Sequence, residues 1–186
     1  MAQQSIIPLE TLMAKQVRES LEQTMLRAAQ EFKVAITSHN LIYVSRDDIT
    51  AINAGIQGIE KLTPRDFQTG ANLMFHYISL PSGARLRGSQ QSLPQGYYLV
   101  RAFFDQSTGK SKAQLLDEAG KLVLEIPAEI EIHAPPSEVT PMRYVAAATG
   151  GIDTNLCVTL DIHVSVVNQD GTLSGALDAK VKYCIN

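Results

Sequence analysis

The sequence predicts an α+β fold in which a long N-terminal amphipathic helix precedes an antiparallel β-sheet. Between Pro8 and Lys33, apolar residues recur every three or four positions, which is typical of a helix with one buried face. From Tyr97 onward, apolar and polar residues alternate in runs separated by short turn sequences, which is typical of antiparallel strands. We therefore expect a single domain over 1–186, with the helix in 1–35, a mixed segment in 36–96 and the β region in 97–186.

The composition is that of a globular domain. The chain has 186 residues, 45% of them hydrophobic, and a formal net charge of −3. A chain of this length buries roughly 70% of its unfolded surface on folding. The balance of charges argues against general nucleic-acid binding, which relies on clustered Lys and Arg. No apolar run approaches the roughly 20 residues of a membrane-spanning helix, and the pattern of a secretory signal is missing. We expect a cytoplasmic protein without a membrane span.

The predicted N-terminal helix has a regular apolar stripe and a face of mixed charge. Pro8 suits the first turn of a helix, and Lys33 suits its negative C-terminal end. One interpretation is that the helix covers a sheet, and another is that it also pairs with its copy in a homo-oligomer. The stripe consists of Leu9, Met13, Val17, Leu21, Met25, Ala28 and Phe32.

The middle segment gives mixed signals for short helices and strands. Ser45 and Asp48 have the spacing of a capping box before isoleucines at helical spacing, which predicts a helix over Ile49–Ile59. Thr63, Pro64 and Asp66 repeat this helix-start pattern. The remaining expectations are strands at Leu41–Val44 and Leu73–Leu80 and a loop at Pro81–Gly96.

The β region predicts about five to seven antiparallel strands, in a β-sandwich-like or half-open sheet whose dry face the helices cover. Pro127 is expected at a sheet edge or a bulge. The segment Thr149-Gly150-Gly151 lacks the GxGxxG pattern and is interpreted as a flexible connection. The first strands are expected at Tyr97–Phe104, Lys112–Asp117 and Lys121–His133.

The last hairpin can be predicted to the level of its register. Apolar residues occupy even positions from Leu156 to Val166 and odd positions from Leu173 to Ile185. A two-residue turn at Asp170-Gly171 places both apolar rows on one face, whereas a three-residue loop would place them on opposite faces. The predicted pairs on the polar face are Asp161 with Lys180, His163 with Asp178 and Cys157 with Cys184.

Two of these pairs have chemical alternatives. A disulfide between Cys157 and Cys184 would add about 3.5 kcal/mol of stability by the loop-entropy relation, but the missing secretion signal favours two free thiols. His163 and Asp178 have the form of a base with its orienting carboxylate. Because no nucleophile converges on them, we interpret them as a surface pair.

The sequence contains no catalytic, cofactor-binding or metal-binding motif. Gly109-Lys110-Ser111 resembles the end of a P-loop, but Phe104 stands where the loop needs glycine. The four histidines, at positions 39, 76, 133 and 163, lie in separate segments without metal-site spacing. We therefore predict no catalytic residue, no cofactor and no metal site.

Two groups of residues remain as candidate binding sites. His76, Tyr77, Tyr97 and Arg101 could line a pocket between helix and sheet, with Phe75 and Phe103 as further apolar walls. Arg85 and Arg87, in the Gly- and Ser-rich loop, could bind an anion or a carboxylate of a partner.

The sequence favours a non-enzymatic binding or assembly protein that is homo-oligomeric, with a protein partner or its own copy as ligand. The long helix and the edge strands support this hypothesis, because free strand edges pair with other chains. The alternative is a small-molecule binding protein or enzyme with an apolar pocket between helix and sheet.

Overall fold

The computed structural model describes residues 5–8, 15–37, 41–89, 91–133 and 143–186, which form ten antiparallel strands and two α-helices. The strands are β1 (Ser5–Pro8), β2 (Ile42–Arg46), β3 (Ile49–Gly55), β4 (Ala71–Ser79), β5 (Gly96–Asp105), β6 (Lys110–Leu116), β7 (Leu122–Ile132), β8 (Arg143–Ile152), β9 (Cys157–Val167) and β10 (Leu173–Cys184). The helices are α2 (Lys15–Glu31), α3 (Pro64–Thr69) and a short 3-10 helix, η2 (Ile59–Lys61).

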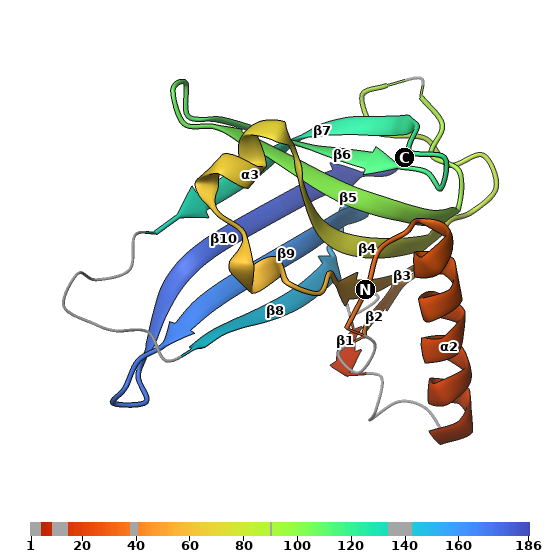
Figure 1. Ribbon diagram of the computed structural model, residues 1–186. Helices are drawn as coiled ribbons and strands as arrows, with labels where there is room; N and C mark the ends of the chain where they lie inside the picture. Colours follow the sequence, from red (N-terminus) through yellow and green to blue (C-terminus); the bar gives the residue numbers. More distant parts are fainter. Residues whose placement is uncertain (1–4, 9–14, 38–40, 90, 134–142) are drawn as a thin grey trace.

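All ten strands belong to one strongly curved sheet. The order is β1-β2-β3-β4-β5-β6-β7-β10-β9-β8, so the chain meanders through its first seven strands and then starts again at the far edge. The curvature brings β8 alongside β2 and β3, which nearly closes the sheet into a barrel (Figure 1). We call the meeting of β8 with β2 and β3 the seam.

The predicted α+β class is wrong, because the described chain is mostly antiparallel β-structure. It has ten strands instead of five to seven, and the long N-terminal helix packs outside the inner core instead of covering the dry face of the sheet. The physical reason is the curvature: a sheet that curls back on itself buries its inward side chains against one another. The inner core accordingly consists mainly of residues from the strands themselves.

The described N-terminal helix, α2, covers part of the predicted span of Pro8 to Lys33. Pro8 belongs to β1, α2 begins at Lys15, and residues 9–14 of the predicted stripe lie outside the described residues. Lys33 follows the helix with φ +58°, the left-handed conformation that commonly ends a helix. The helix lies on the outer face of the barrel, where Met25 and Ala29 are buried in a second core with residues of β3 and β4.

The predicted helix over Ile49–Ile59 is wrong, since Ile49–Gly55 is strand β3. Asp47 and Asp48 form a two-residue hairpin turn, with Asp47 at φ +52°, and Ser45 bonds the Ile49 carbonyl rather than capping a helix. The isoleucine spacing misleads because β3 is covered on both faces. Ile49 and Ala51 pack in the inner core, whereas Ile52 packs against α2.

The second predicted helix start is confirmed. Thr63 and Asp66 form the capping box of α3, with Pro64 in its first turn. The segment from β3 to β4 lies over the concave side of the sheet, with η2 against β8 and β9 and α3 against β4 and β5 (Figure 1). It contributes Ile59 and Phe67 to the inner core.

The predicted register of the last hairpin is confirmed from Leu177 onward, but the register next to the turn and the turn itself differ. Asp161 pairs with Lys180, His163 with Asp178 and Cys157 with Cys184, as predicted. The loop has three residues, closed by hydrogen bonds between Asn168 and Thr172. A bulge between Gly175 and Leu177 adds one residue and restores the predicted parity beyond it. Leu173, on the turn side of the bulge, is therefore 67% exposed.

Pro127 lies where β7 changes partners. The strand pairs with β6 up to Pro127 and with β10 from Ala128 onward. Because proline has no N–H for a ladder, this position suits it. The predicted loop after β4 covers the part of β10 that β7 leaves free, since Leu86 bridges to Ile185 and Gln91 donates to the Val123 carbonyl.

Candidate functional site

The edge of β8 at the seam carries backbone groups that point away from β9. Asp153 N donates to the Cys157 carbonyl, so odd positions of β8 direct their backbone groups toward β9. Even positions therefore face the seam, which agrees with the Ile152 carbonyl accepting from Arg46 Nε at 2.9 Å. Among the described residues, no strand pairs with β8 along this second edge.

Two contacts close one end of the seam. The first is the buried Arg46 to Ile152 hydrogen bond. The second places Asn53 of β3 against Gly150 of β8, where a Cβ on Gly150 would lie 2.4 Å from Asn53 Nδ2 and 3.2 Å from the Thr159 carbonyl oxygen. Any side chain at position 150 would thus meet Asn53, so glycine permits the close approach of β8 to β3.

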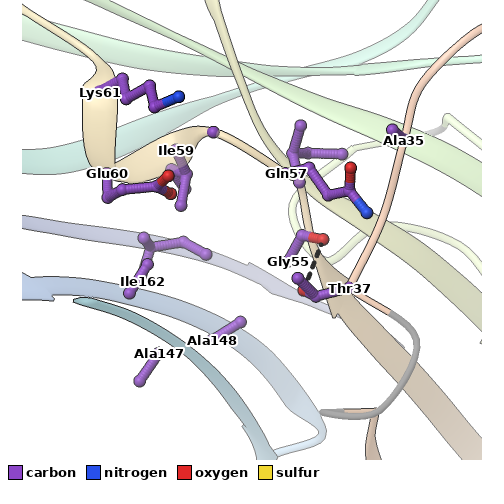
Figure 2. A pocket seen from close by; sticks show the side chains of 13 residues that line it. Ala35, Thr37, Gly55, Gln57, Ile59, Glu60, Lys61, Ala147, Ala148 and Ile162 are labelled. Atoms are coloured by element: carbon purple, nitrogen blue, oxygen red, sulfur yellow. Dashed lines mark hydrogen bonds between the residues drawn. The ribbon is translucent and has the colours of Figure 1, made fainter. Parts of the chain in front are cut away.

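Beyond these contacts the seam opens into a cavity of about 690 Å³ (Figure 2). One wall is the end of β3 with the segment paired to it, the second wall is η2, and the floor is β8 with Ile162 of β9. Gly55 and Ala148 mark the narrow end, since a Cβ on Gly55 would lie 3.8 Å from Ala148 Cβ. The lining residues are Ala35, Thr37, Gly55, Ile56, Gln57, Gly58, Ile59, Glu60, Lys61, Ala146, Ala147, Ala148 and Ile162.

The cavity combines a fixed polar wall with a charged one. Thr37 Oγ1 donates to the Gly55 carbonyl at 3.0 Å, and Gln57 Nε2 donates to the Ile36 carbonyl at 3.1 Å, so both side chains are held by the backbone. Glu60 and Lys61 lie on the opposite wall (Figure 2), where Glu60 is half-buried and Lys61 is exposed. The arrangement offers hydrogen-bonding and charged groups around an alanine-rich floor.

A buried polar cluster lies in the interior beside the narrow end of the seam. His76 Nδ1 lies 2.7 Å from Asn53 Oδ1, and His76 Nε2 lies 2.6 Å from the Tyr183 hydroxyl. Because the amide oxygen only accepts, Nδ1 carries the proton and Nε2 accepts from Tyr183. Complete burial lowers the pKa of His76 to about 3 and raises the pKa of Tyr183. Asn53 Nδ2 is buried and has no hydrogen-bond partner among the described residues.

The structure places the four predicted pocket residues in three different environments. Tyr77 and Tyr97 contact each other on the outer face beside α2, with ring centroids 4.9 Å apart. His76 points into the interior, and Arg101 donates to Asn72 at 3.2 Å. Phe75 fills the core between α2 and the sheet with Phe32 and Tyr97, and a Cβ on Gly70 would meet Phe103.

The two loop arginines form hydrogen bonds with the last residues of the chain. Arg87 donates to the carbonyls of Asn155 and Ile185, and its own N–H bonds the Cys184 carbonyl. The Arg85 carbonyl accepts from the Asn186 N–H. The Arg87 guanidinium is thus engaged by backbone oxygens, and its role in the structure is to hold the loop against β10.

The cysteine pair is oxidised. Cys157 and Cys184 form a disulfide across β9 and β10, 27 residues apart in sequence, so the expectation of two free thiols is wrong.

Thr149-Gly150-Gly151, interpreted as a flexible connection, is part of β8. The small residues of this segment are the sequence feature that marks the seam. Only the position of Asn53 on β3 shows why a small residue is needed at Gly150.

The predicted His163 and Asp178 pair is present on the surface, with Nδ1 and Oδ1 2.5 Å apart. The structure adds two residues that the sequence reasoning left separate, because β7 pairs with β10. His133 Nε2 lies 3.1 Å from Asp178 Oδ2 and 3.8 Å from Glu131 Oε2. The Asp178 carboxylate therefore contacts the imidazole rings of both His133 and His163.

Comparison with known proteins adds no relative. No family model, curated protein or solved structure matches this chain. The described helices are all too short or too polar to cross a membrane. The assignment of function therefore rests on the geometry of the seam.

Proposed function

We propose that this chain is a non-enzymatic binding protein that accepts an extended segment of a protein partner along the edge of β8. The observation that carries this proposal is the row of seam-facing backbone groups at Ala146 and Ala148, which borders a cavity of about 690 Å³. An extended peptide gains main-chain hydrogen bonds when it adds to such an edge.

The side chains along the edge suit a second backbone. A ladder places neighbouring strands about 4.8 Å apart, and alanines at positions 146, 147 and 148 leave room for this approach. The opposite wall supplies Glu60 and Lys61, which can select polar side chains on the partner. Because β3 approaches β8 at Gly55 and Ala148, an incoming strand would lie beside β8 beyond the end of β3 and would extend the closure of the seam.

A proline at position 146 tests the ladder directly. Ala146→Pro removes the seam-facing N–H without removing a hydrogen bond to β9, so the fold should survive and strand addition should not. Ala146→Ser, which keeps the N–H, is the matched control. Peptides selected from a random heptamer library on the wild-type chain should bind Ala146→Pro at least tenfold more weakly and Ala146→Ser within threefold, as measured by fluorescence anisotropy.

Equal binding of the selected peptides to wild type and Ala146→Pro would contradict strand addition at this edge, and so would failure of the wild-type chain to select any peptide. Circular dichroism of both variants controls for folding. A partner that is a second copy of the chain would instead show as a dimer in light scattering, lost in Ala146→Pro.

The cavity volume supports a second candidate function, the binding of a small molecule, because ligand pockets range from about 300 to 1,000 Å³. Filling the floor with Ala148→Leu would abolish this binding. A small molecule that stabilises wild type and Ala146→Pro equally, but not Ala148→Leu, would favour this alternative over a peptide strand.

A further inference from the structure

Three strands bring four ionisable side chains into one group on the exposed face of the sheet. Asp178 of β10 pairs with Glu131 of β7 on one side and with His163 of β9 on the other. His133 follows Glu131 two residues later on the same face, and its N–H bonds the Ala176 carbonyl, which keeps the end of β7 beside β10. The bulge leaves Gly175 next to the His133 ring, where a Cβ would lie 3.6 Å from Cδ2.

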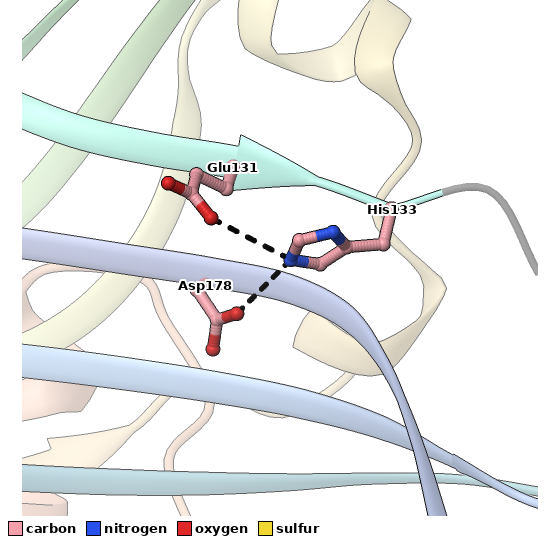
Figure 3. A group of neighbouring side chains, drawn as sticks. All are labelled: Glu131, His133 and Asp178. Atoms are coloured by element: carbon pink, nitrogen blue, oxygen red, sulfur yellow. Dashed lines mark hydrogen bonds and ion pairs between the residues drawn. The ribbon is translucent and has the colours of Figure 1, made fainter.

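The distances within the group are close to those between ligands of one metal ion. His133 Nε2 lies 3.1 Å from Asp178 Oδ2 and 3.8 Å from Glu131 Oε2, and the three ligand atoms lie within 4.8 Å of one another (Figure 3). Ligands about 2.1 Å from a tetrahedral zinc ion stand roughly 3.4 Å apart. Small rotations of exposed side chains would therefore place all three atoms around one ion.

The charges of the group favour a cation. The carboxylates of Glu131 and Asp178 occupy directly opposed positions on neighbouring strands, where like charges repel. The Asp178 carboxylate also lies within hydrogen-bond distance of a ring nitrogen of both His163 and His133. A divalent ion between the two carboxylates would relieve their repulsion and would bind His133 through Nε2.

We propose that Glu131, His133 and Asp178 bind a divalent transition-metal ion of the zinc type. One imidazole and two carboxylates suit zinc or a neighbouring first-row ion, whereas magnesium and calcium prefer oxygen donors alone. His163 is a positioning residue, because its Nδ1 holds the second oxygen of Asp178 at 2.5 Å and so orients the first toward the ion. The site is accessible from solvent, since His133 and Asp178 are 42% and 45% exposed.

Titration calorimetry with zinc chloride tests the site in the full, untagged, oxidised chain. We expect one zinc ion per chain, at least tenfold weaker binding in His133→Ala and Asp178→Asn, and about tenfold weaker binding in His163→Ala. Glu129→Gln is the matched control, because Glu129 is an exposed carboxylate on the same face of β7 outside the group. It should bind zinc within twofold of wild type.

Two results would overturn the proposal: no zinc binding by the wild-type chain, or binding that His133→Ala leaves unchanged, which would mean an adventitious ion only. A second measurement does not depend on the variants. In NMR spectra, zinc should shift the ring resonances of His133 and His163 and leave those of the buried His76 in place. Unchanged His133 resonances at saturating zinc would also contradict the site.

Discussion

His76 Nε2 accepts a hydrogen bond from the Tyr183 hydroxyl at 2.6 Å, and this bond joins β4 to β10 across the interior of the barrel. The two strands are not neighbours in the sheet. Both side chains are completely buried, and the other ring nitrogen of His76, Nδ1, is hydrogen-bonded to Asn53 Oδ1. These two hydrogen bonds fix the relative position of the strands, because separating the strands would leave the buried ring nitrogens of His76 unpaired.

Removing the Tyr183 hydroxyl should destabilise the fold. Tyr183→Phe leaves His76 Nε2 buried without a donor, which we expect to lower the free energy of unfolding by about 1–3 kcal/mol. Urea denaturation followed by circular dichroism measures this loss. Tyr77→Phe is the control, because the Tyr77 hydroxyl is on the half-buried outer face and the change should cost less than about 0.5 kcal/mol. Equal stability of wild type and Tyr183→Phe would contradict the assigned hydrogen bond.

His76 should also make stability depend on pH. Burial holds the pKa of His76 at about 3 in the folded chain, against 6.5 in the unfolded chain. Between these two pH values only the unfolded state takes up the proton. The folded state therefore has its full stability above pH 6.5 and loses stability as the pH falls toward 3. We expect the free energy of unfolding to fall by about 2 kcal/mol between pH 7 and pH 5. In His76→Gln this dependence should largely disappear; the same slope in both proteins would show that His76 is not its source.

The disulfide should contribute to stability through the unfolded state. Its closed loop spans 27 residues, for which loop entropy predicts about 3.5 kcal/mol. Dithiothreitol should lower the urea midpoint of the wild-type chain accordingly, whereas the double variant Cys157→Ser with Cys184→Ser should not respond. Mass spectrometry after alkylation gives an independent check, since two alkylated cysteines without reductant would mean free thiols.

The three-residue turn of the last hairpin depends on Gly171. Gly171 has φ +83°, which other residues adopt at a cost, so Gly171→Ala should lower the free energy of unfolding by about 1 kcal/mol. Gly175→Ala is the matched glycine control, because its added Cβ would meet only His133 Cδ2 at 3.6 Å, an ordinary contact distance. A thermal melt compares the two variants, and an equal loss in both would argue against a special role for the turn.

Local sequence patterns are sufficient where the structure depends on residues that are neighbours in the chain. The capping box at Thr63 and Asp66 depends on neighbours in sequence, and it is confirmed. The register that pairs His163 with Asp178 is also confirmed, because burial of two apolar rows on one face permits few alternatives. The isoleucine spacing in Ile49–Gly55 predicts a helix, because the sequence does not show that both faces of β3 are covered.

The sequence by itself determined the alternation of the C-terminal strands, the facing cysteines and the amphipathic stripe that α2 uses. The tertiary structure decided the closure of the sheet, the seam at Gly150, and the meeting of His133 with Asp178. These features depend on strand order and curvature, which bring together residues far apart in the chain. Local propensity and periodicity are the same for many strand orders, so only packing of the whole sheet selects one.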